Sequence, residues 1–186
     1  HRRRHSFPTR RSSDLHAGNR DFVVSGAGAV TLTGGIFLSG DQTGRQLYVN
    51  LSGTGGMTVN GPVADTFHSG GLTTGTSTLR KASSGMLRIN GNSTYTALTQ
   101  VDAGVLLVNG THAPLANSQR YTVAGTATFG GTGIIKPFDT TASLTCITIS
   151  GTLAPGDPLT NNGLGKLTLD GTNSARSLLA LETGAK

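Results

Sequence analysis

Residues 85–110 read GMLRINGNSTYTALTQVDAGVLLVNG and contain one short motif twice, as Leu87-Arg88-Ile89-Asn90-Gly91 and as Leu106-Leu107-Val108-Asn109-Gly110. The motif has two apolar residues separated by one position, then a mostly polar residue, then a glycine. Its closing glycines recur at intervals of 19, 21, 20 and 20 residues, at Gly91, Gly110, Gly131, Gly151 and Gly171. A period near 20 residues is typical of solenoid proteins, in which each repeat buries its apolar side only against its neighbours.

Each motif suits a strand of four or five residues, because its two apolar side chains point to the same face. Weaker copies occupy residues 30–34 and 57–61. Asn-Gly and Asp-Gly pairs such as Asn90-Gly91 predict turns, since both residue types tolerate positive φ. We expect corners between stacked coils and not hairpins, because hairpins would place two strands in each repeat. Roughly eight coils about 4.8 Å apart would form a rod about 35–40 Å long.

The asparagines that precede the closing glycines have two interpretations. They could stack from coil to coil, as asparagine ladders do in stacked sheets. They could also serve only the turn, which asparagine favours. The sequence alone leaves both open.

The composition predicts an all-β protein with little or no helix. The chain of 186 residues has 28 glycines and no tryptophan. It is also rich in threonine, serine, valine and leucine, which suit short strands and tight turns. No window repeats apolar residues at helical spacing over three turns. No run of 18 apolar residues predicts a membrane-spanning helix.

The segment 85–110 closely resembles the passenger-associated transport repeat, also called the autotransporter-associated β-strand repeat. Residues 152–156 and 165–169 look like the block that commonly follows such repeats. Where the family usually has Thr-Gly-Gly-Thr, this chain has Thr-Ala-Leu-Thr at 96–99, which changes a turn and not the strand pattern. The matching residues are Gly85, Leu87, Ile89, Gly91, Asn92, Thr94, Tyr95, Thr96, Val101, Ala103, Gly104, Leu106, Val108, Asn109 and Gly110.

This resemblance implies a right-handed parallel β-helix in an exported passenger region on a bacterial cell surface. In that family the repeat is associated with translocation and with stalk formation. The implied partners are neighbouring coils and a carboxy-terminal outer-membrane barrel of the same full-length chain, with a host surface or a polysaccharide as a further ligand. We therefore expect a structural rod segment, not an enzyme, in a fragment of a longer protein.

The first 15 residues differ from the rest of the chain. Residues 5–15 (HSFPTRRSSDL) resemble a translated sequencing adapter, so we expect 1–15 to be an artefactual tag and 16–186 to be the β-solenoid. Its best repeat spans 79–110, and its late coils span 121–186. The tag holds five of the 15 basic and one of the nine acidic residues, so the formal charge falls from +6 to +2 without it. The clustered basic surface of a nucleic-acid binder is then missing, and we predict no nucleic-acid partner.

Two segments are predicted to leave the regular coils. Between Gly61 and Leu79 the period is blurred, and residues 67–71 (FHSGG) look like an irregular coil or a loop. Residues 157–163 form a second candidate loop, where Pro155 and Pro158 should prevent regular pairing.

We predict no catalytic, cofactor-binding or metal-binding residues. Asp139 and Asp157 are the nearest candidates for a glycosidase pair, which needs two carboxyls about 5–9.5 Å apart, and solvated turn residues are the simpler reading of both. Cys146 is expected to be an inert strand residue, because free cysteines are commonly buried. The histidines His16, His68 and His112 lack metal-ligand spacing and are expected in surface loops.

The alternative function is a carbohydrate-binding or polysaccharide-degrading β-helix. It predicts a cleft in which acids or aromatic residues align from coil to coil. The tyrosines Tyr48, Tyr95 and Tyr121 do not recur at one position of the repeat, which gives this alternative little support.

Overall fold

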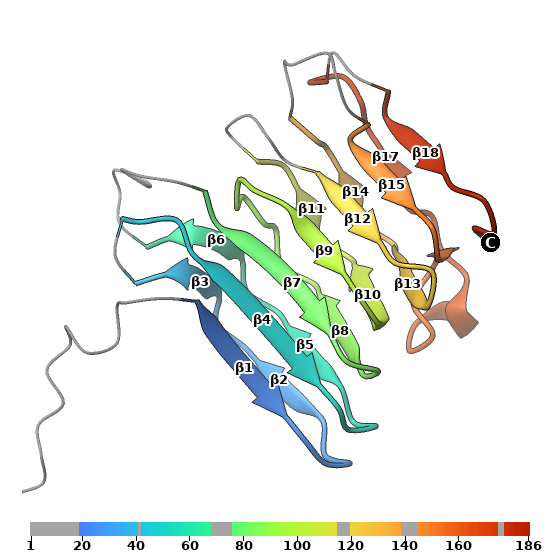
Figure 1. Cartoon of the computed structure of the whole chain (residues 1–186). Coiled ribbons are helices and arrows are strands. Elements are labelled where there is room, and N and C mark those ends of the chain that lie inside the picture. The colour runs from blue at the N-terminus through green and yellow to red at the C-terminus, as the bar shows by residue number, and fades with distance from the viewer. Residues whose placement is uncertain (1–18, 41, 68–75, 115–119, 139–144, 175–176) are drawn as a thin grey trace, which may run out of the picture.

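The chain folds almost entirely into short β-strands. The computed structural model describes residues 19–40, 42–67, 76–114, 120–138, 145–174 and 177–186. The largest sheet has seven strands, β1 (Arg20–Val24), β4 (Gln46–Leu51), β7 (Thr78–Ala82), β9 (Thr99–Val101), β12 (Tyr121–Val123), β15 (Ile147–Ile149) and β18 (Leu179–Leu181). They lie in this order from one edge of the sheet to the other (Figure 1).

Three further sheets complete the fold. The second sheet has six strands, β2 (Val30–Leu32), β5 (Met57–Val59), β8 (Met86–Ile89), β10 (Gly104–Val108), β13 (Ala127–Gly131) and β16 (Thr152–Pro155). A three-stranded sheet contains β11 (Thr111–His112), β14 (Ile134–Ile135) and β17 (Thr168–Leu169). A two-stranded sheet pairs β3 (Ile36–Ser39) with β6 (Val63–Thr66). One 3₁₀ turn, η2 (Asn161–Gly163), is the only helical element in the described residues, which confirms the predicted all-β class.

Strands that follow one another in a sheet are paired in parallel. Between two strands of the seven-stranded sheet, the chain passes through the other sheets and returns one strand further along (Figure 1). For example, β7 is followed by β8 of the six-stranded sheet and then by β9, which pairs in parallel with β7. The prediction that these turns are not hairpins is confirmed, because a two-residue hairpin can join only antiparallel strands.

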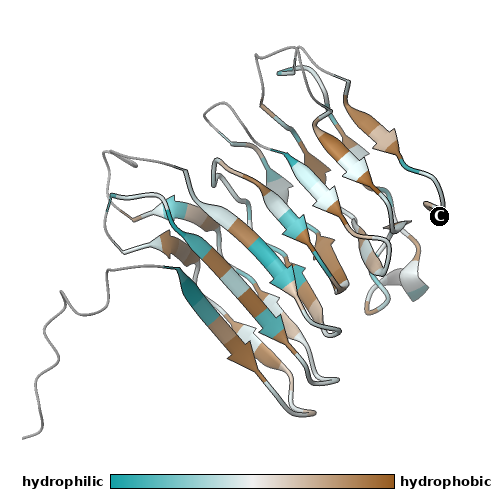
Figure 2. Ribbon diagram, viewed as in Figure 1, coloured by the Kyte–Doolittle hydropathy of each residue, from teal (hydrophilic) through white to brown (hydrophobic). Residues whose placement is uncertain are grey.

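One apolar core lies between the two large sheets. Several strands bury alternate residues in this core, as β4 does with Leu47, Val49 and Leu51. Residues of the six-stranded sheet, including Leu106 and Phe129, belong to the same core cluster. Figure 2 shows the apolar residues distributed along both sheets, so that each strand contributes to a core continuous through the stack.

The predicted fixed period near 20 residues is wrong. In the seven-stranded sheet Leu79 pairs with Thr99, 20 positions later, but Leu47 pairs with Leu79, 32 positions later. The two last motif copies are also not equivalent to the others. Ile147–Ile149 is in the seven-stranded sheet and residues 167–169 reach the three-stranded sheet, whereas the motifs at 30, 57, 87, 106 and 127 lie in the six-stranded sheet. Any half-buried strand that ends at a turn has this pattern of residues. The motif therefore does not indicate which sheet the strand belongs to.

The turn glycines are needed for a different reason from the one predicted. Gly61, Gly91 and Gly110 do not have positive φ. A Cβ on Gly91 would instead collide with the carbonyl group of Gly61, the glycine that closes the motif of the neighbouring strand β5. The corners therefore stack backbone on backbone, and only glycine permits that approach.

Residues 157–163 lie outside the strands, as predicted, but Pro155 does not prevent pairing. It is the last residue of β16 and pairs with Gly131 of β13. This is permitted because β16 is at the edge of its sheet, where a missing backbone N–H breaks no ladder.

The tag at 1–15 and residues 68–71 of the first candidate loop lie outside the described residues. The largest sheet has seven strands in place of the roughly eight coils expected. Within the described part of the chain, no helix is long and apolar enough to cross a membrane.

Candidate functional site

The outer face of the seven-stranded sheet carries a row of polar side chains in register. Tyr48 of β4 pairs with Arg80 of β7, which pairs with Gln100 of β9, and the row continues through Thr122 and Thr148. These are the outward positions of their strands, because the residues on both sides of each one are buried. Figure 2 shows the hydrophilic bands on β7 and β9 near the middle of the sheet.

Four of the side chains on this face form a connected network. The Arg80 guanidinium donates to one oxygen of Asp102, and Gln100 Nε2 donates to the other oxygen at 2.7 Å. On its other side Arg80 donates to the Tyr48 hydroxyl at 3.4 Å and lies 5.1 Å from the centre of the Tyr48 ring. The hydrogen bond with Asp102 raises the pKa of Arg80, so the guanidinium stays charged. The network therefore holds the Asp102 carboxylate in one orientation.

A hollow of about 310 Å³ begins where this network ends. Its side chains come from β9, β12 and β15 and from the residues that follow them, and we call it the sheet groove. It exists because the large residues Tyr48, Arg80 and Gln100 are succeeded in the same row by Thr122 and Thr148, which are much smaller. The lining residues are Gln100, Val101, Asp102, Thr122, Val123, Ala124, Thr148 and Ser150.

The six-stranded sheet has its own buried network, built on Asp157. The Arg88 guanidinium donates to both Asp157 oxygens, at 2.6 and 2.9 Å, and Asn109 Nδ2 donates at 2.7 Å. The hydrogen bond from Arg88 is the main reason that the pKa of Asp157 falls to about 2. The reading of Asp157 as a solvated turn residue is wrong, because the residue is only 1% exposed. Asp139, its predicted companion, lies outside the described residues.

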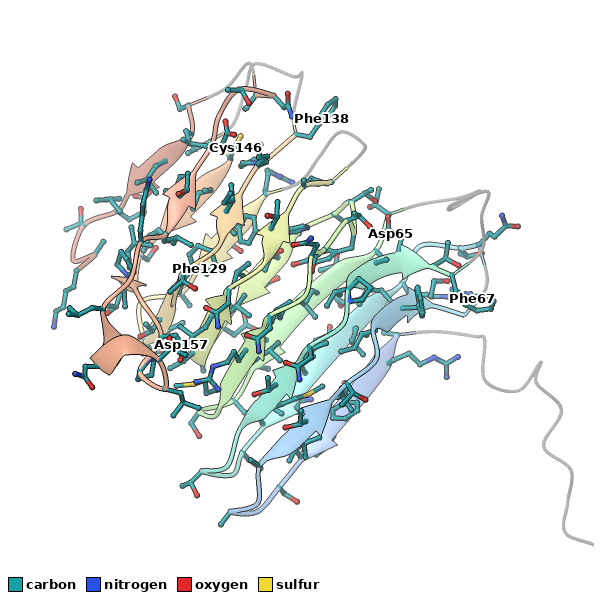
Figure 3. The ribbon with its side chains drawn as sticks, turned by 180° about the vertical axis from the view of Figure 1, so that it is seen from behind. Asp65, Phe67, Phe129, Phe138, Cys146 and Asp157 are labelled. Carbon is teal, nitrogen blue, oxygen red and sulfur yellow. The ribbon has the colours of Figure 1, made fainter. Side chains whose placement is uncertain are left out.

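The asparagines that follow β5, β8 and β10 form a ladder. Asn90 Nδ2 donates to Asn60 Oδ1 at 2.8 Å, and Asn109 Nδ2 donates to Asn90 Oδ1 at 2.9 Å. The same Asn109 amide donates to Asp157, which is labelled in Figure 3, so the ladder ends at the buried ion pair. Of the two interpretations that the sequence left open, the structure has the ladder.

His112 is buried in β11 and not exposed in a loop, which corrects the prediction for this residue. Its ring stacks on Tyr95 with centres 4.1 Å apart. Nε2 lies 3.2 Å from the Tyr95 carbonyl oxygen and Nδ1 contacts the Tyr121 hydroxyl. A neutral ring protonated at Nε2 satisfies both contacts, and burial lowers the pKa of His112 to about 4. His16 and His68 lie outside the described residues.

Cys146 is buried, as predicted, but lies one residue before β15 and not within a strand. Its sulfur is 2.9 Å from the Ser174 hydroxyl.

The three tyrosines occupy different rows, since Tyr48 is at an outward position, Tyr121 is inward in β12 and Tyr95 lies between β8 and β9. The prediction that tyrosines share no common position is confirmed.

Sequence reasoning also missed the buried cation Lys81. It is fully buried in β7, and its ammonium donates to the carbonyl oxygens of Ala82, Ser83 and Ala103 at 2.8, 2.6 and 3.2 Å. Burial lowers its pKa to about 8. The alternation of β7 could have found it, because Leu79 and Lys81 are two residues apart and must share a face.

The two networks use their carboxylates in the same way. Asp102 and Asp157 each form an ion pair with an arginine, and each carboxylate accepts hydrogen bonds from that arginine. The residues that the structure describes contain no cluster of histidine, cysteine, aspartate or glutamate able to hold a metal ion.

No protein-family model, curated protein or solved structure matches this chain. The chemistry of the site therefore has to be argued from its own residues.

Proposed function

We propose that this chain is a structural rod segment of a secreted, surface-displayed passenger of the autotransporter type. In this proposal the four sheets are the sides of a right-handed parallel β-helix, whose coils have unequal lengths because loops leave some of them. The observation that supports it is the order of the seven-stranded sheet, in which every strand after β1 pairs with the strand of the preceding coil.

Such an arrangement suits a stalk for a physical reason. Each coil contributes its own ladder hydrogen bonds and its own layer of the core, so that stability grows with the number of coils. The asparagine ladder and the close contacts of Gly61, Gly91 and Gly110 repeat the same interactions along the stack. Coils that form one after another could also give secretion a direction, since a coil folded outside the membrane opposes backward movement.

A structural role also agrees with the chemistry of the acids. The carboxylate of Asp157 is held by Arg88, Asn109 and the backbone N–H of Leu159. An acid whose pKa is lowered to about 2 is a poor proton donor near neutral pH. We therefore propose that the chain is not an enzyme and that its place is the bacterial surface, tethered to the outer membrane.

The experiment is to follow arrival at the cell surface of the protein expressed from its own gene. Leu106→Asp would place a charge in a fully buried position of the core and break one coil, whereas Thr31→Asp changes an exposed residue of the same sheet. We expect the first variant to reach the surface more slowly than the parent and the second at the parental rate. Equal rates for all three proteins would remove the basis for a role in translocation.

A further inference from the structure

We propose that the sheet groove binds an uncharged polysaccharide that lies across β9, β12 and β15, along the stacking direction. This function is separate from the role of a rod, since a stalk needs no ligand. The proposal starts from the groove's volume of about 310 Å³, which is close to the lower end of the usual range for ligand sites, about 300–1,000 Å³.

The floor of the groove presents hydroxyl groups. Among the described residues, the side chains of Thr122, Thr148 and Ser150 have no hydrogen-bond partner. Each hydroxyl can donate one hydrogen bond and accept others. Thr122 and Thr148 are paired in register on neighbouring strands, so equivalent groups recur about 4.8 Å apart along the stack. A ligand that matches this floor carries its own hydroxyl groups at short, regular intervals, which is the chemistry of a sugar chain.

The wall of the groove supplies an oriented acceptor. Arg80 and Gln100 each occupy one oxygen of the Asp102 carboxylate, and an ionised carboxylate has about four acceptor sites. Asp102 can therefore still accept a hydrogen bond from a ligand hydroxyl, and that bond is strengthened by its charge. Because Arg80 neutralises Asp102, the wall attracts hydroxyl donors without placing a net charge beside them.

The same features argue against other ligand classes. A polyanion such as a nucleic acid would need unpaired cations. Among the described residues that line the groove, the only ionisable one is the acid Asp102, and the adjacent Arg80 is bound to it. A peptide strand adds to the edge of a sheet, whereas this groove lies on the face of three internal strands. An acyl chain would offer no hydrogen bond to the hydroxyl groups of the groove or to the remaining acceptor sites of the Asp102 carboxylate.

The experiment measures binding of the full chain to immobilised neutral polysaccharides, namely dextran, mannan, a β-glucan and a galactan, with heparin as the anionic comparison. The test variant is Thr122→Val/Thr148→Val, which removes two hydroxyls while keeping side-chain shape and strand propensity. We expect saturable binding of the parent to at least one neutral polysaccharide. Each lost hydrogen bond should weaken that binding roughly two- to tenfold.

The matched control is Thr31→Val, an exposed threonine of the six-stranded sheet that is outside the groove. It should bind as the parent does, and all three proteins should unfold at the same denaturant concentration within error. The proposal is overturned if no neutral polysaccharide binds saturably, or if the double variant binds as tightly as the parent. Binding to heparin alone would also overturn it, because the five arginines of residues 1–15 would account for that result.

Discussion

Asp157 follows Arg88 by 69 residues in the chain, yet its carboxylate accepts two hydrogen bonds from the Arg88 guanidinium. The side chains are only 9% and 1% exposed. Arg88 belongs to β8 and Asp157 comes just after β16, with β10 and β13 lying between these strands in the sheet. The pair thus links the segment that follows β16 to β8, across the two strands that lie between them; Asp157 is labelled in Figure 3.

Asp157→Asn should destabilise the fold by about 3 kcal/mol, because it leaves the Arg88 charge buried without a counter-ion. Replacing both partners, as Arg88→Met/Asp157→Leu, should recover most of this loss, since an apolar pair of similar volume removes the buried charge altogether. Denaturant unfolding of the parent and both variants measures the two differences. A double variant as unstable as Asp157→Asn would show that the charge is not what matters.

The asparagine ladder predicts a directional effect at Asn90, which donates to Asn60 and accepts from Asn109. Asn90→Asp keeps the acceptor but loses the donor and sets a carboxylate against the Asn60 carbonyl oxygen. We expect a loss of about 1 kcal/mol, the usual net value of one hydrogen bond. Asn173→Asp, at an exposed position outside the ladder, should change stability by less than about 0.5 kcal/mol. Similar losses in both variants would mean that added negative charge, and not the ladder, is responsible.

The sequence was sufficient to predict the all-β class, because strand alternation and turn residues are local properties. It predicted the motifs at Leu87 and Leu106 as equivalent, and the structure pairs these two residues directly. It failed at Ala127, where the alignment of motifs pairs Leu106 with Ala127 but the structure pairs Leu106 with Phe129. Strand register depends on packing between neighbouring strands, and a motif of five residues contains no information about the length of the loop before it.

The sites were harder to predict because they depend on contacts between distant residues. Nothing near Asp157 in the sequence indicates that Arg88 will neutralise it. The burial of His112 likewise depends on Tyr95 and Tyr121, which surround it only after the coils stack. The sheet groove arises from a decrease in side-chain size along one row, from Arg80 to Thr122, and such a row can be recognised only once the register is known.

The turn glycines allow a matched test, because Gly91 and Gly34 close the same motif in different surroundings. A Cβ at Gly91 would overlap the Gly61 carbonyl group, whereas a Cβ at Gly34 would meet no atom within 4 Å. Gly91→Ala should therefore cost about 3 kcal/mol through overpacking of the stacked corners. Gly34→Ala should be neutral or slightly stabilising, since alanine reduces the entropy of the unfolded chain. Equal unfolding midpoints for the two variants would contradict the stacking of corners described above.

His112 should make stability depend on pH between about 4 and 6.5. Burial lowers its pKa from 6.5 to about 4 in the folded chain, so the unfolded chain binds a proton in this range that the folded chain does not. The contribution is fully present above pH 6.5 and decreases as the pH falls towards 4, by up to about 3 kcal/mol. Unfolding free energies measured across this range for the parent and for His112→Gln isolate the effect, because all other titrating groups are common to both. The parent should lose stability on acidification more steeply than the variant, which lacks the imidazole. Parallel curves for the two proteins would show that the His112 ring is not held neutral by burial.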